Sequence, residues 1–302
     1  MDGEEVCSST LTKVLNEHEE KKLEEQNQRL VSDHKAGMLE IQAKKHWDLF
    51  YKRNETRFFK DRHWTTREFC ELINDNVDER KTVFEIGCGV GNFIFPLIKD
   101  KINLFALACD LSPRAVEMVK SNPLYDENHI HAFQGDIVST EILGHVELES
   151  VDIATLIFVL SAIHPDKFVK TLQNIHLLLK KDGIILFRDY GLYDMAQLRF
   201  KAGHKISENF YMRQDGTRSF YFSLDYIKTI FEEAGFEIIE NSYIHRRTIN
   251  KKENIDVPRI FVQTKAKKKS WDIYEQCRSI PTQVHKCNSV ITNTGRTIKL
   301  KE

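Results

Sequence analysis

A glycine-rich turn carries the residues whose spacing most clearly suggests chemistry. Gly87, Gly89 and Gly91 occupy alternate positions after an apolar run, and Glu85 precedes the first of them. Glycine is favoured where the backbone must turn sharply or approach a ligand, because it has no Cβ. A dinucleotide fingerprint would need its third glycine where the sequence has Asn92. The spacing therefore favours a cradle for S-adenosylmethionine over a pyrophosphate site.

Two aspartates follow at the ends of the next two apolar runs. Asp110 is placed to accept hydrogen bonds from both ribose hydroxyls, and Asp136 to accept one from an adenine amino group. Ile137 would pack on the adenine ring, and Ile157, near the end of the fourth run, belongs to the same expected cofactor set. Either aspartate alone would more often be a helix cap or a solvated loop residue. Together with the glycines, at the carboxyl ends of successive strands, they predict a cofactor site.

These positions require a sheet of parallel strands. Five near-continuous apolar runs are typical of parallel strands covered on both faces, and they span residues 82–86, 103–109, 129–134, 151–158 and 183–190. Helices are predicted over 113–121, 165–179 and 224–234, the last ending at Gly235. Two further strands, 236–243 and 257–264, are predicted to form an antiparallel hairpin. The alternation predicts an α/β, Rossmann-like class I methyltransferase fold: a seven-stranded, mostly parallel sheet with an antiparallel last strand and helices on both faces.

The rest of the chain divides by composition. Residues 1–40 hold ten acidic and five basic residues, which predicts an acidic, flexible or helical arm. Residues 41–80 are basic and aromatic, and residues 81–264 form the expected methyltransferase domain. Within that domain, residues 191–222 are an insertion that we expect on the substrate side. Residues 265–302 begin with clustered lysines and predict a basic, poorly ordered tail.

Bulk properties exclude several classes of protein. A net charge of -1 over 302 residues excludes a uniformly basic nucleic-acid binder but permits local basic surfaces. The six cysteines form no C-x-x-C pair and no metal-ligand spacing with histidine, so we expect reduced thiols and no metal. No stretch approaches the ~18–20 apolar residues that a membrane span needs. We expect a protein of the cytoplasm, with the nucleus left open as a second location.

The residues after the fourth predicted strand narrow the group that is methylated. Enzymes that methylate exocyclic amines often have a [D/N]-P-P-[Y/F/W] loop there, whereas this chain continues with residues 156–165, LIFVLSAIHP. No cysteine is placed to attack a pyrimidine ring, so carbon methylation through a covalent adduct is also disfavoured.

Several aromatic and charged segments carry a more specific resemblance. Residues 45–51 read KHWDLFY, residues 57–62 read RFFKDR and are followed by Trp64, and residues 187–194 read FRDYGLYD. Over about residues 40–265 the chain resembles the tRNA N3-methylcytidine methyltransferases, and especially the member associated with serine tRNA. The resemblance implies a S-adenosylmethionine-dependent enzyme that methylates N3 of cytidine 32 in the tRNA anticodon loop. It also implies serine tRNA as substrate and suggests seryl-tRNA synthetase as a partner. Residues after about 270 do not match the family.

The resemblance and the chemistry together assign three further residues. Asp189, just past the fifth predicted strand, is the candidate catalytic carboxylate, because it could stabilise the cationic product and accept from the cytosine amine. A salt bridge to Arg188 or a cap is the alternative. Trp47 and Tyr51 are four residues apart, on one face if the segment is helical. The resemblance favours a lid over the cofactor, and an anchor on the core is the alternative.

The RNA-facing residues are expected to combine cations with stacking surface. Arg57, Phe58 and Phe59 fit single-stranded RNA recognition in this respect. The other expected RNA contacts are Arg188, Tyr190, Tyr193, His204 and Arg259. Further candidate phosphate contacts are Lys205, Arg213, Arg218, Arg246, Arg247, Lys251, Lys252, Lys267, Lys268 and Lys269, any one of which is more often a solvated surface charge.

Two other functions remain open from the sequence. A small-molecule or protein methyltransferase could use the same fold, because function depends on the site and not on the fold. That enzyme would need a compact substrate pocket and no basic aromatic arm. A cofactor-binding partner subunit with a dead site is the second alternative, and the intact glycine turn with Asp189 argues against it.

Overall fold

A central sheet of parallel strands organises the protein, as the apolar runs predict. The computed structural model describes residues 7–73, 79–250, 255–269, 290–291 and 297–298. Neighbouring parallel strands lie in the order β6-β5-β2-β3-β4. Their bounds are β2 (Lys81–Ile86), β3 (Leu104–Asp110), β4 (Ile130–Gln134), β5 (Val151–Ile157) and β6 (Leu179–Tyr190). The five predicted parallel strands are therefore confirmed.

A long antiparallel hairpin completes the sheet beside β6. Strand β11 (Ile255–Lys268) pairs antiparallel with β6, and β10 (Phe236–Asn250) pairs with β11. The reversed last strand is confirmed, but the short connection expected over residues 244–256 is wrong in extent, because both strands continue through most of it. Strand β1 (Cys7–Ser9) pairs with β10, so the sheet of the described residues has eight strands where seven are expected.

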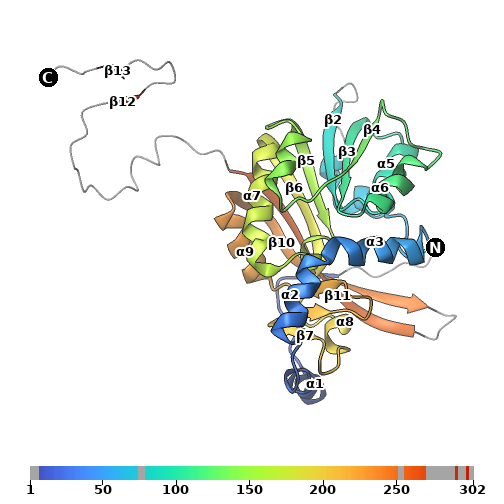
Figure 1. The fold of residues 1–302 in the computed structure, drawn as a ribbon, viewed down its shortest axis with the longest axis vertical. Helices are drawn as coiled ribbons and strands as arrows, with labels where there is room; N and C mark the ends of the chain where they lie inside the picture. Colours follow the sequence, from blue (N-terminus) through green and yellow to red (C-terminus); the bar gives the residue numbers. More distant parts are fainter. Residues whose placement is uncertain (1–6, 74–78, 251–254, 270–289, 292–296, 299–302) are drawn as a thin grey trace. The chain divides into compact units, whose positions relative to one another are not determined.

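Helices cover both faces of the sheet (Figure 1). The helices α5 (Ile94–Lys99) and α6 (Pro113–Lys120) lie on one face, and α7 (Phe168–Leu178) and α9 (Leu224–Glu233) lie on the other. Local signals fix their ends. Ser112 caps α6 and Pro113 starts it, while Ser223 caps α9 and Gly235 follows it at φ +93°.

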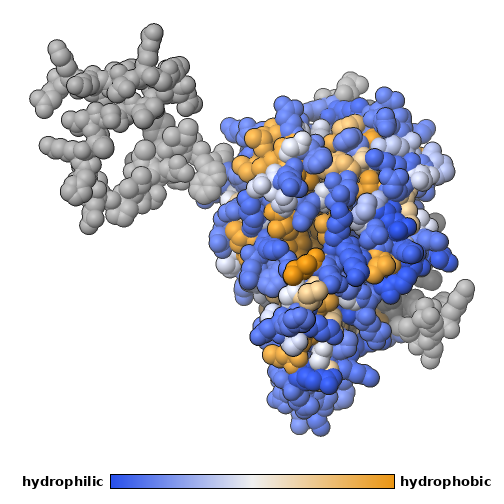
Figure 2. Space-filling model, viewed as in Figure 1, coloured by the Kyte–Doolittle hydropathy of each residue, from blue (hydrophilic) through white to orange (hydrophobic). Residues whose placement is uncertain are grey.

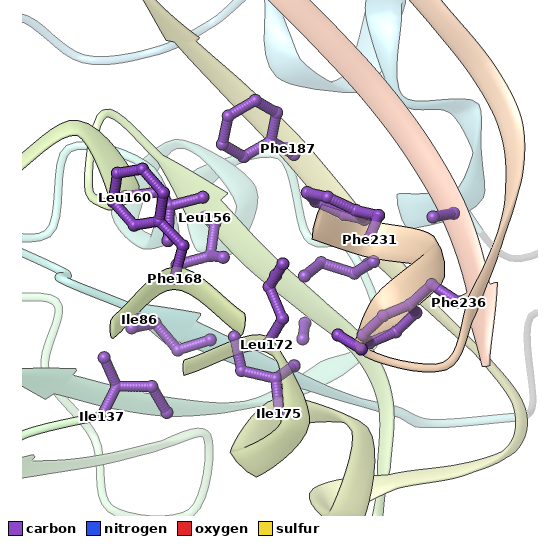
Figure 3. Close-up of a cluster of buried hydrophobic side chains, with 14 of the residues drawn as sticks. Ile86, Ile137, Leu156, Leu160, Phe168, Leu172, Ile175, Phe187, Phe231 and Phe236 are labelled. Atoms are coloured by element: carbon purple, nitrogen blue, oxygen red, sulfur yellow. The ribbon is translucent and has the colours of Figure 1, made fainter. Parts of the chain in front are cut away.

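Side chains of each strand alternate between two buried layers. Phe84 and Ile86 of β2 face the layer under α7 and α9, whereas Val83 faces the layer under α5 and α6. Phe187 in β6 joins the first layer, where it contacts Phe231 of α9 edge to face (Figure 3). The core thus holds the parallel strands from both sides and fixes the edge at which their carboxyl ends meet.

The N-terminal arm is packed on the insertion, so the structure favours the helical alternative over the flexible one. It contains α1 (Glu17–Asn27) and α2 (Asp33–Ile41), and the expected helical potential is confirmed. Gln26 is 1% exposed, and its Nε2 donates to the carbonyls of Gln197 (3.0 Å) and Phe200 (3.1 Å). The hydroxyl of Tyr211 donates to Oε1 of the same glutamine at 2.9 Å. A buried amide whose donors and acceptor are used holds the arm in place.

The insertion itself is ordered around a small sheet. It contains α8 (Met195–Leu198) and the antiparallel strands β7 (Lys205–Ser207), β8 (Phe210–Met212) and β9 (Arg218–Phe220). Between the arm and the first strand of the central sheet lie α3 (Ala43–Asn54), α4 (Thr65–Glu68) and a short 3-10 helix, η1 (Cys70–Leu72).

The beginning of the expected basic tail belongs to the central sheet. Lys265, Lys267 and Lys268 lie in β11, so the expectation of a poorly ordered tail is wrong for these residues. Residues 270–302 form a separate unit, in which β12 (Val290–Ile291) and β13 (Thr297–Ile298) pair antiparallel. Lys269 follows β11, and its N–H donates to the Gly235 carbonyl at 3.0 Å. Residues 270–289, 292–296 and 299–302 lie outside the described residues.

Candidate active site

A cavity of about 380 Å³ opens at the carboxyl ends of the parallel strands. Loops after β2, β3, β4 and β5 form its walls, and α2 and α3 border it from the arm. Figure 2 shows hydrophobic side chains over the junction of α2 and α3, where Ile41 is 78% exposed and borders the cavity. Open α/β sheets bind ligands at this edge. The predicted cofactor residues that line the cavity are Trp47, Tyr51, Gly87, Asp110, Asp136 and Ile137.

The glycine loop has the backbone that its sequence predicts. Gly87, Gly89 and Gly91 have φ values of +66°, +54° and +86°, which side chains rarely adopt. Only Gly87 lines the cavity, and a Cβ there would lie 2.5 Å from a methyl group of Val159. A Cβ on Gly89 would meet the Tyr51 hydroxyl at 2.9 Å, and one on Gly91 would meet the Phe95 ring at 2.3 Å. The two later glycines are therefore required by packing and not by direct contact with the cavity.

Asp110 ties the glycine loop to β3. One carboxylate oxygen accepts from the Gly89 N–H at 2.9 Å, and the other accepts from the Ser112 N–H at 2.8 Å. Burial raises the pKa of Asp110 to about 6, and these two N–H groups limit the rise. Each oxygen can accept a second hydrogen bond, as the predicted ribose contact requires.

The loop after β4 presents the expected adenine wall. Asp136 and Ile137 both line the cavity, and Asp136 caps the loop by accepting from the Val138 N–H at 3.0 Å. Asn174 of α7 holds the loop from behind, because its amide donates to the Ile137 carbonyl at 2.7 Å. The sequence left open whether Asp136 is a cap or a ligand contact. One carboxylate can serve both roles, because each oxygen accepts more than one hydrogen bond.

Glu85 has an unsatisfied buried carboxylate. It is 5% exposed, and its Oε2 has no hydrogen-bond partner among the described residues. Burial raises its pKa well above the usual value, although Arg62 favours the ionised form. A bound ammonium group would satisfy the free oxygen, since a buried charge needs a partner. S-adenosylmethionine carries an ammonium group, so the residues present fit this cofactor.

Trp47 and Tyr51 come from one face of α3, as their spacing predicts. Their rings lie 6.2 Å apart and line the cavity, which agrees with the lid alternative. Tyr51 also packs with Phe50 and Val90, so it anchors the helix at the same time. A further anchor comes from Asp48, whose carboxylate accepts from the Ser112 hydroxyl at 2.9 Å.

Ile157 does not line the cavity, so its place in the predicted cofactor set stays a prediction. It is 4% exposed and packs in the layer under α5 and α6. The next residue, Phe158, lines the cavity instead at φ +60°, a conformation that its sequence does not reveal. Its N–H donates to the Arg188 carbonyl at 2.8 Å, which holds the turn against β6.

Asp189 is completely buried beside this turn. Its two carboxylate oxygens accept from the N–H groups of Ser161 and Tyr190, each at 2.9 Å. It is not among the residues that line the cavity, and its expected contact with a target base stays a prediction. Burial raises its pKa to about 6, and the Ser161 N–H opposes the rise. The carboxylate caps the first turn of the 3-10 helix η3 (Leu160–Ala162), so of the two alternatives the cap, and not the Arg188 salt bridge, matches the structure.

Arg188 is a structural residue, which corrects its assignment to the RNA surface. It is 1% exposed, pairs with Glu68 and lies 4.2 Å from the centre of the Trp64 ring. Arg246 of β10 pairs with the same glutamate and faces the same ring at 5.5 Å. In a strand, adjacent residues face opposite sides. Arg188 therefore points into the layer opposite to that of Phe187.

Tyr190 stands in an aromatic group next to the cavity. Its ring lies 5.1 Å from Phe158 and 5.7 Å from Tyr221. The guanidinium of Arg213, from the insertion, lies 5.3 Å from the ring centre. The group therefore joins the cavity wall, the end of β6 and the insertion.

The other three expected RNA contacts near β6 have internal partners. Arg259 pairs with the fully buried Asp194 at 2.9 Å. The Tyr193 N–H donates to the Gln197 side chain, and Tyr193 itself has φ +61°. His204 bonds through Nδ1 to the Met212 carbonyl at 2.8 Å. The partner of Arg259 corrects its expected role as a simple phosphate contact, because this cation is already neutralised.

Arg57, Phe58 and Phe59 form an exposed corner after α3. Phe58 is 58% exposed, and its ring contacts those of Phe50 and Phe59, each at 4.9 Å. Arg57 is largely exposed and pairs with Glu55 at 3.2 Å. The corner keeps the combination of cation and stacking surface that the sequence predicts.

Most of the other candidate phosphate contacts are also paired within the protein. Their pairs are Lys205–Glu208, Arg218–Glu40, Arg246–Glu68, Arg247–Asp256, Lys267–Asp182 and Lys268–Glu149. The side chains of Lys205 and Arg218 are nearly buried as well. Lys251 and Lys252 lie outside the described residues. Counting cations in the sequence overestimates the surface available to RNA.

Two partners of these cations were missed by sequence reasoning. Glu68 joins β6 to β10, and Glu40 joins Lys167 and Arg218 at the rim of the cavity. Acidic residues in a charged segment give no local signal of such pairing. In the described part of the chain, no group of three or more His, Cys, Asp or Glu side chains could hold a metal ion. None of the helices formed by the described residues is both long and apolar enough to cross a bilayer.

The fold and the cavity define a S-adenosylmethionine-dependent methyltransferase. A family model described as a methyltransferase domain matches residues 61–241. Relatives then define the family. The human tRNA N(3)-cytidine methyltransferase METTL6 is 55% identical over 255 residues, which cover 84% of this chain and 89% of that protein. The tRNA N(3)-methylcytidine methyltransferase trm140 of Schizosaccharomyces pombe is 39% identical, covering 82% of this chain and 80% of that protein. The chain belongs to the tRNA N3-methylcytidine methyltransferase family.

Solved structures share the fold at low identity. A S-adenosylmethionine-dependent methyltransferase from Anabaena variabilis has a TM-score of 0.54 and 15% identity, covering 75% of this chain and 95% of that one. The 1,6-didemethyltoxoflavin-N1-methyltransferase of Burkholderia thailandensis, solved with S-adenosylhomocysteine, has a TM-score of 0.52 and 13% identity, covering 80% and 92%.

Proposed function

We propose that this enzyme transfers a methyl group from S-adenosylmethionine to N3 of cytidine 32 in the anticodon loop of serine tRNAs. The proposal rests on the names of the relatives and on the sequence segments around Trp47, Arg57 and Asp189. The observation that carries it is the aromatic group at Tyr190, which extends from the cofactor cavity toward the insertion.

The chemistry demands positioning more than proton transfer. Cytosine N3 has a free lone pair at neutral pH, so no general base is needed, and the cofactor supplies an electrophilic methyl group. The base must leave its stack and align N3 with that methyl group. Phe158 lines the cavity and Tyr190 adjoins it, so both offer stacking surface near the cofactor.

Asp189 acts in this proposal as a fixed negative charge behind the reacting base. At neutral pH, a carboxyl group whose pKa is about 6 is mostly ionised. The methylated base is cationic, and a preorganised charge stabilises it without rearrangement. Its hydrogen bond to the Ser161 N–H also orients the cavity wall that contains Phe158. Direct contact between Asp189 and the cytosine amine remains a prediction for the tRNA complex.

A synthetase partner is compatible with the pairing of the basic residues. Because so many candidate phosphate contacts are already neutralised, we expect modest affinity for free tRNA. Seryl-tRNA synthetase would hold serine tRNA and raise its effective concentration at the methyltransferase. Equal methylation rates with and without the purified synthetase, at limiting tRNA, would remove this part of the proposal.

The test uses two serine tRNA transcripts that differ only at position 32. The purified chain is incubated with labelled S-adenosylmethionine and either the natural transcript or one carrying uridine at that position. Label is expected in the natural transcript only. Equal incorporation into both would show that another position is methylated. Incorporation into a small molecule or a protein, with neither RNA labelled, would favour the alternative class of enzyme.

A further inference from the structure

A second hollow, of about 560 Å³, lies between the N-terminal arm and the insertion, where α2 is beside β7 (Figure 1). Leu39 of α2 and Met212 of β8 pack together at its wall. Its cationic and imidazole side chains are Arg29, Lys35, His46, His204 and Arg213. Three of these are cations at neutral pH with the histidines neutral, and the hollow contains one carboxylate, that of Asp215. The excess of positive charge suits an anion.

The single carboxylate of the hollow does not neutralise these cations directly. One oxygen of Asp215 accepts from the N–H of Thr217 at 2.9 Å and from its hydroxyl at 2.7 Å. In the described part of the chain neither Asp215 nor Arg213 forms an ion pair, whereas Arg218 in the next strand pairs with Glu40. Arg213 therefore keeps a positive charge for a further group.

Arg213 connects the hollow with the active site. Its guanidinium lies 5.3 Å from the centre of the Tyr190 ring, and Asp189 is near enough to act on it electrostatically. Its backbone is held in a tight turn, because its N–H donates to the Thr217 carbonyl at 2.8 Å and its carbonyl accepts from the Gly216 N–H at 3.1 Å. The turn places this cation between the hollow and the aromatic group beside the cofactor cavity.

The arm completes the hollow from the other side. The Arg29 side chain donates to the Ala202 carbonyl at 3.3 Å. His46 of α3 packs so closely on the turn that a Cβ on Gly216 would lie 2.3 Å from its ring nitrogen. His204 donates through Nδ1 to a carbonyl, which leaves Nε2 for another group. The cationic side chains thus come from three segments that are held against one another.

We propose that this hollow binds a backbone phosphate of the tRNA next to cytidine 32, and that Arg213 holds that phosphate while it remains over Tyr190. The proposal rests on the proposed function, because it takes the extruded base to stack beside Tyr190. A base that leaves its stack carries its own phosphates with it, so one of them must lie near the aromatic group. Arg213 is then a positioning residue, which fixes the nucleotide and does not touch the reacting N3 atom.

The surroundings of Arg213 favour the substrate over a protein partner. A guanidinium can donate two parallel hydrogen bonds to a phosphate, which fixes its orientation as well as its position. An acidic segment of a partner protein would match the charge of the hollow equally well. It would not explain why the cation stands over Tyr190, one side chain away from the cofactor cavity. Binding of a protein is therefore a competing outcome of the test.

The test removes one phosphate charge at a time from the substrate. Serine tRNA would be assembled by ligation with a single uncharged methylphosphonate linkage, on the 5′ side or the 3′ side of cytidine 32, or in the acceptor stem as a control. For the wild-type chain, one of the two linkages beside cytidine 32 should lower kcat/KM about 10- to 100-fold, from the usual strength of charge-assisted hydrogen bonds. The linkage in the acceptor stem should leave kcat/KM nearly unchanged.

Three variants assign the lost contact to a side chain. Arg213→Gln should lose a similar factor with unmodified tRNA and little more with the sensitive linkage, because both changes remove the same contact. Arg213→Lys keeps the charge without the planar fork, so it should recover part of the rate. Arg199→Gln is the matched control, because Arg199 is an exposed cation of the same insertion that does not line the hollow. That variant should retain the full effect of the sensitive linkage.

Several results would overturn the proposal. If the uncharged linkage slowed Arg213→Gln as much as the wild type, or slowed neither, Arg213 would not hold that phosphate. If Arg213→Gln lost affinity for S-adenosylmethionine, its role would be to support the cavity wall through Tyr190. Inhibition of the wild type by inorganic phosphate, without any effect of the linkages, would make the hollow a site for free anions. Loss of stimulation by the synthetase alone would assign it to a protein partner. Absence of methylation of unmodified tRNA by the wild type would instead count against the proposed function.

Discussion

The cofactor side and the substrate side of this enzyme are built in different ways. Around the cofactor, backbone groups dominate: glycines at positive φ, and the N–H groups that Asp110 accepts. Around the substrate, ion pairs join segments that are far apart in the chain, such as Arg188–Glu68 and Arg218–Glu40. The cofactor side is therefore held by the conformation and hydrogen bonds of its own loops. The substrate side is held by ion pairs between the arm, the insertion and the hairpin.

The largest expected effect concerns the buried ion-pair cluster. Glu68→Ala leaves Arg188, whose side chain is 2% exposed, without its carboxylate. Removing one partner of a buried pair typically costs about 3–5 kcal/mol, because the other charge stays buried and uncompensated. Denaturant unfolding should show a loss of this size in the free energy of unfolding.

An exposed pair provides the control for that cluster. Glu232→Ala breaks a pair with Lys228 in α9 whose side chains are 52% and 60% exposed, and should cost at most about 0.5 kcal/mol. Similar losses for the two variants would mean that the substrate side does not depend on buried pairing.

The glycine loop should be sensitive to a single methyl group. Gly91→Ala places a Cβ at φ +86° and 2.3 Å from the Phe95 ring. Strain and overpacking together are expected to cost about 2–4 kcal/mol of unfolding free energy. Gly37→Ala is the matched change, because nothing lies within 4 Å of its Cβ and it lies inside α2. There the free energy of unfolding should rise by about 0.5–1 kcal/mol, and a loss at Gly37 as large as that at Gly91 would contradict the account.

Cofactor binding should depend on pH through Asp110. Because burial raises its pKa to about 6, the carboxyl is ionised above that pH and protonated below it. Affinity for S-adenosylmethionine should fall by up to about tenfold per pH unit below about pH 6. Asp110→Asn should bind weakly at every pH, and the remaining slope, from groups such as Glu85, should be shallower. If the affinity of the wild-type protein for S-adenosylmethionine were constant between about pH 5 and about pH 7.5, this prediction would be wrong.

Ionisation of Asp110 favours cofactor binding but lowers the free energy of unfolding. Its pKa is higher in the folded state than in an unfolded chain, so the folded state binds more protons between about pH 4 and about pH 6. The contribution of Asp110, and that of Asp189, to the free energy of unfolding therefore decreases as pH rises through this window.

The smallest expected effect concerns the exposed corner after α3. Phe58→Ala should leave cofactor affinity unchanged and cost little unfolding free energy, because the residue is 58% exposed and its ring contacts only those of Phe50 and Phe59 among the aromatic rings of the described residues. One stacked base contributes about 1–3 kcal/mol, so tRNA binding should weaken by about fivefold or more. Leu148→Ala removes a residue of similar exposure, 54%, and should change neither cofactor affinity nor tRNA binding. Equal tRNA affinity of both variants would exclude Phe58 from the RNA surface.

The sequence predicts the sheet and most of the cofactor cavity because their signals are local. Apolar runs mark the strands, and Gly87, Asp110 and Asp136 follow directly at their ends. The sequence did not predict Phe158 in the cavity wall, because its side chain reaches the cavity through a positive φ, for which phenylalanine gives no sequence signal. The packing of the arm was not predicted because its anchor, Gln26, is a polar residue that is buried through contacts with the insertion.

Charges were the least predictable part of the site. Arg188 and Glu68 lie 120 residues apart in the chain, and Arg259 meets Asp194 across 65 residues. Nothing in the local sequence distinguishes these paired cations from Arg57, which stays largely exposed. Three-dimensional neighbours decide which cations remain available for RNA.

The most direct test of the central claim is the identity of the methylated nucleoside. Total tRNA incubated with the purified chain and labelled S-adenosylmethionine would be digested to nucleosides and separated by mass. The account predicts that the label appears in 3-methylcytidine alone. Label in any other nucleoside, or none despite measurable cofactor binding, would contradict it.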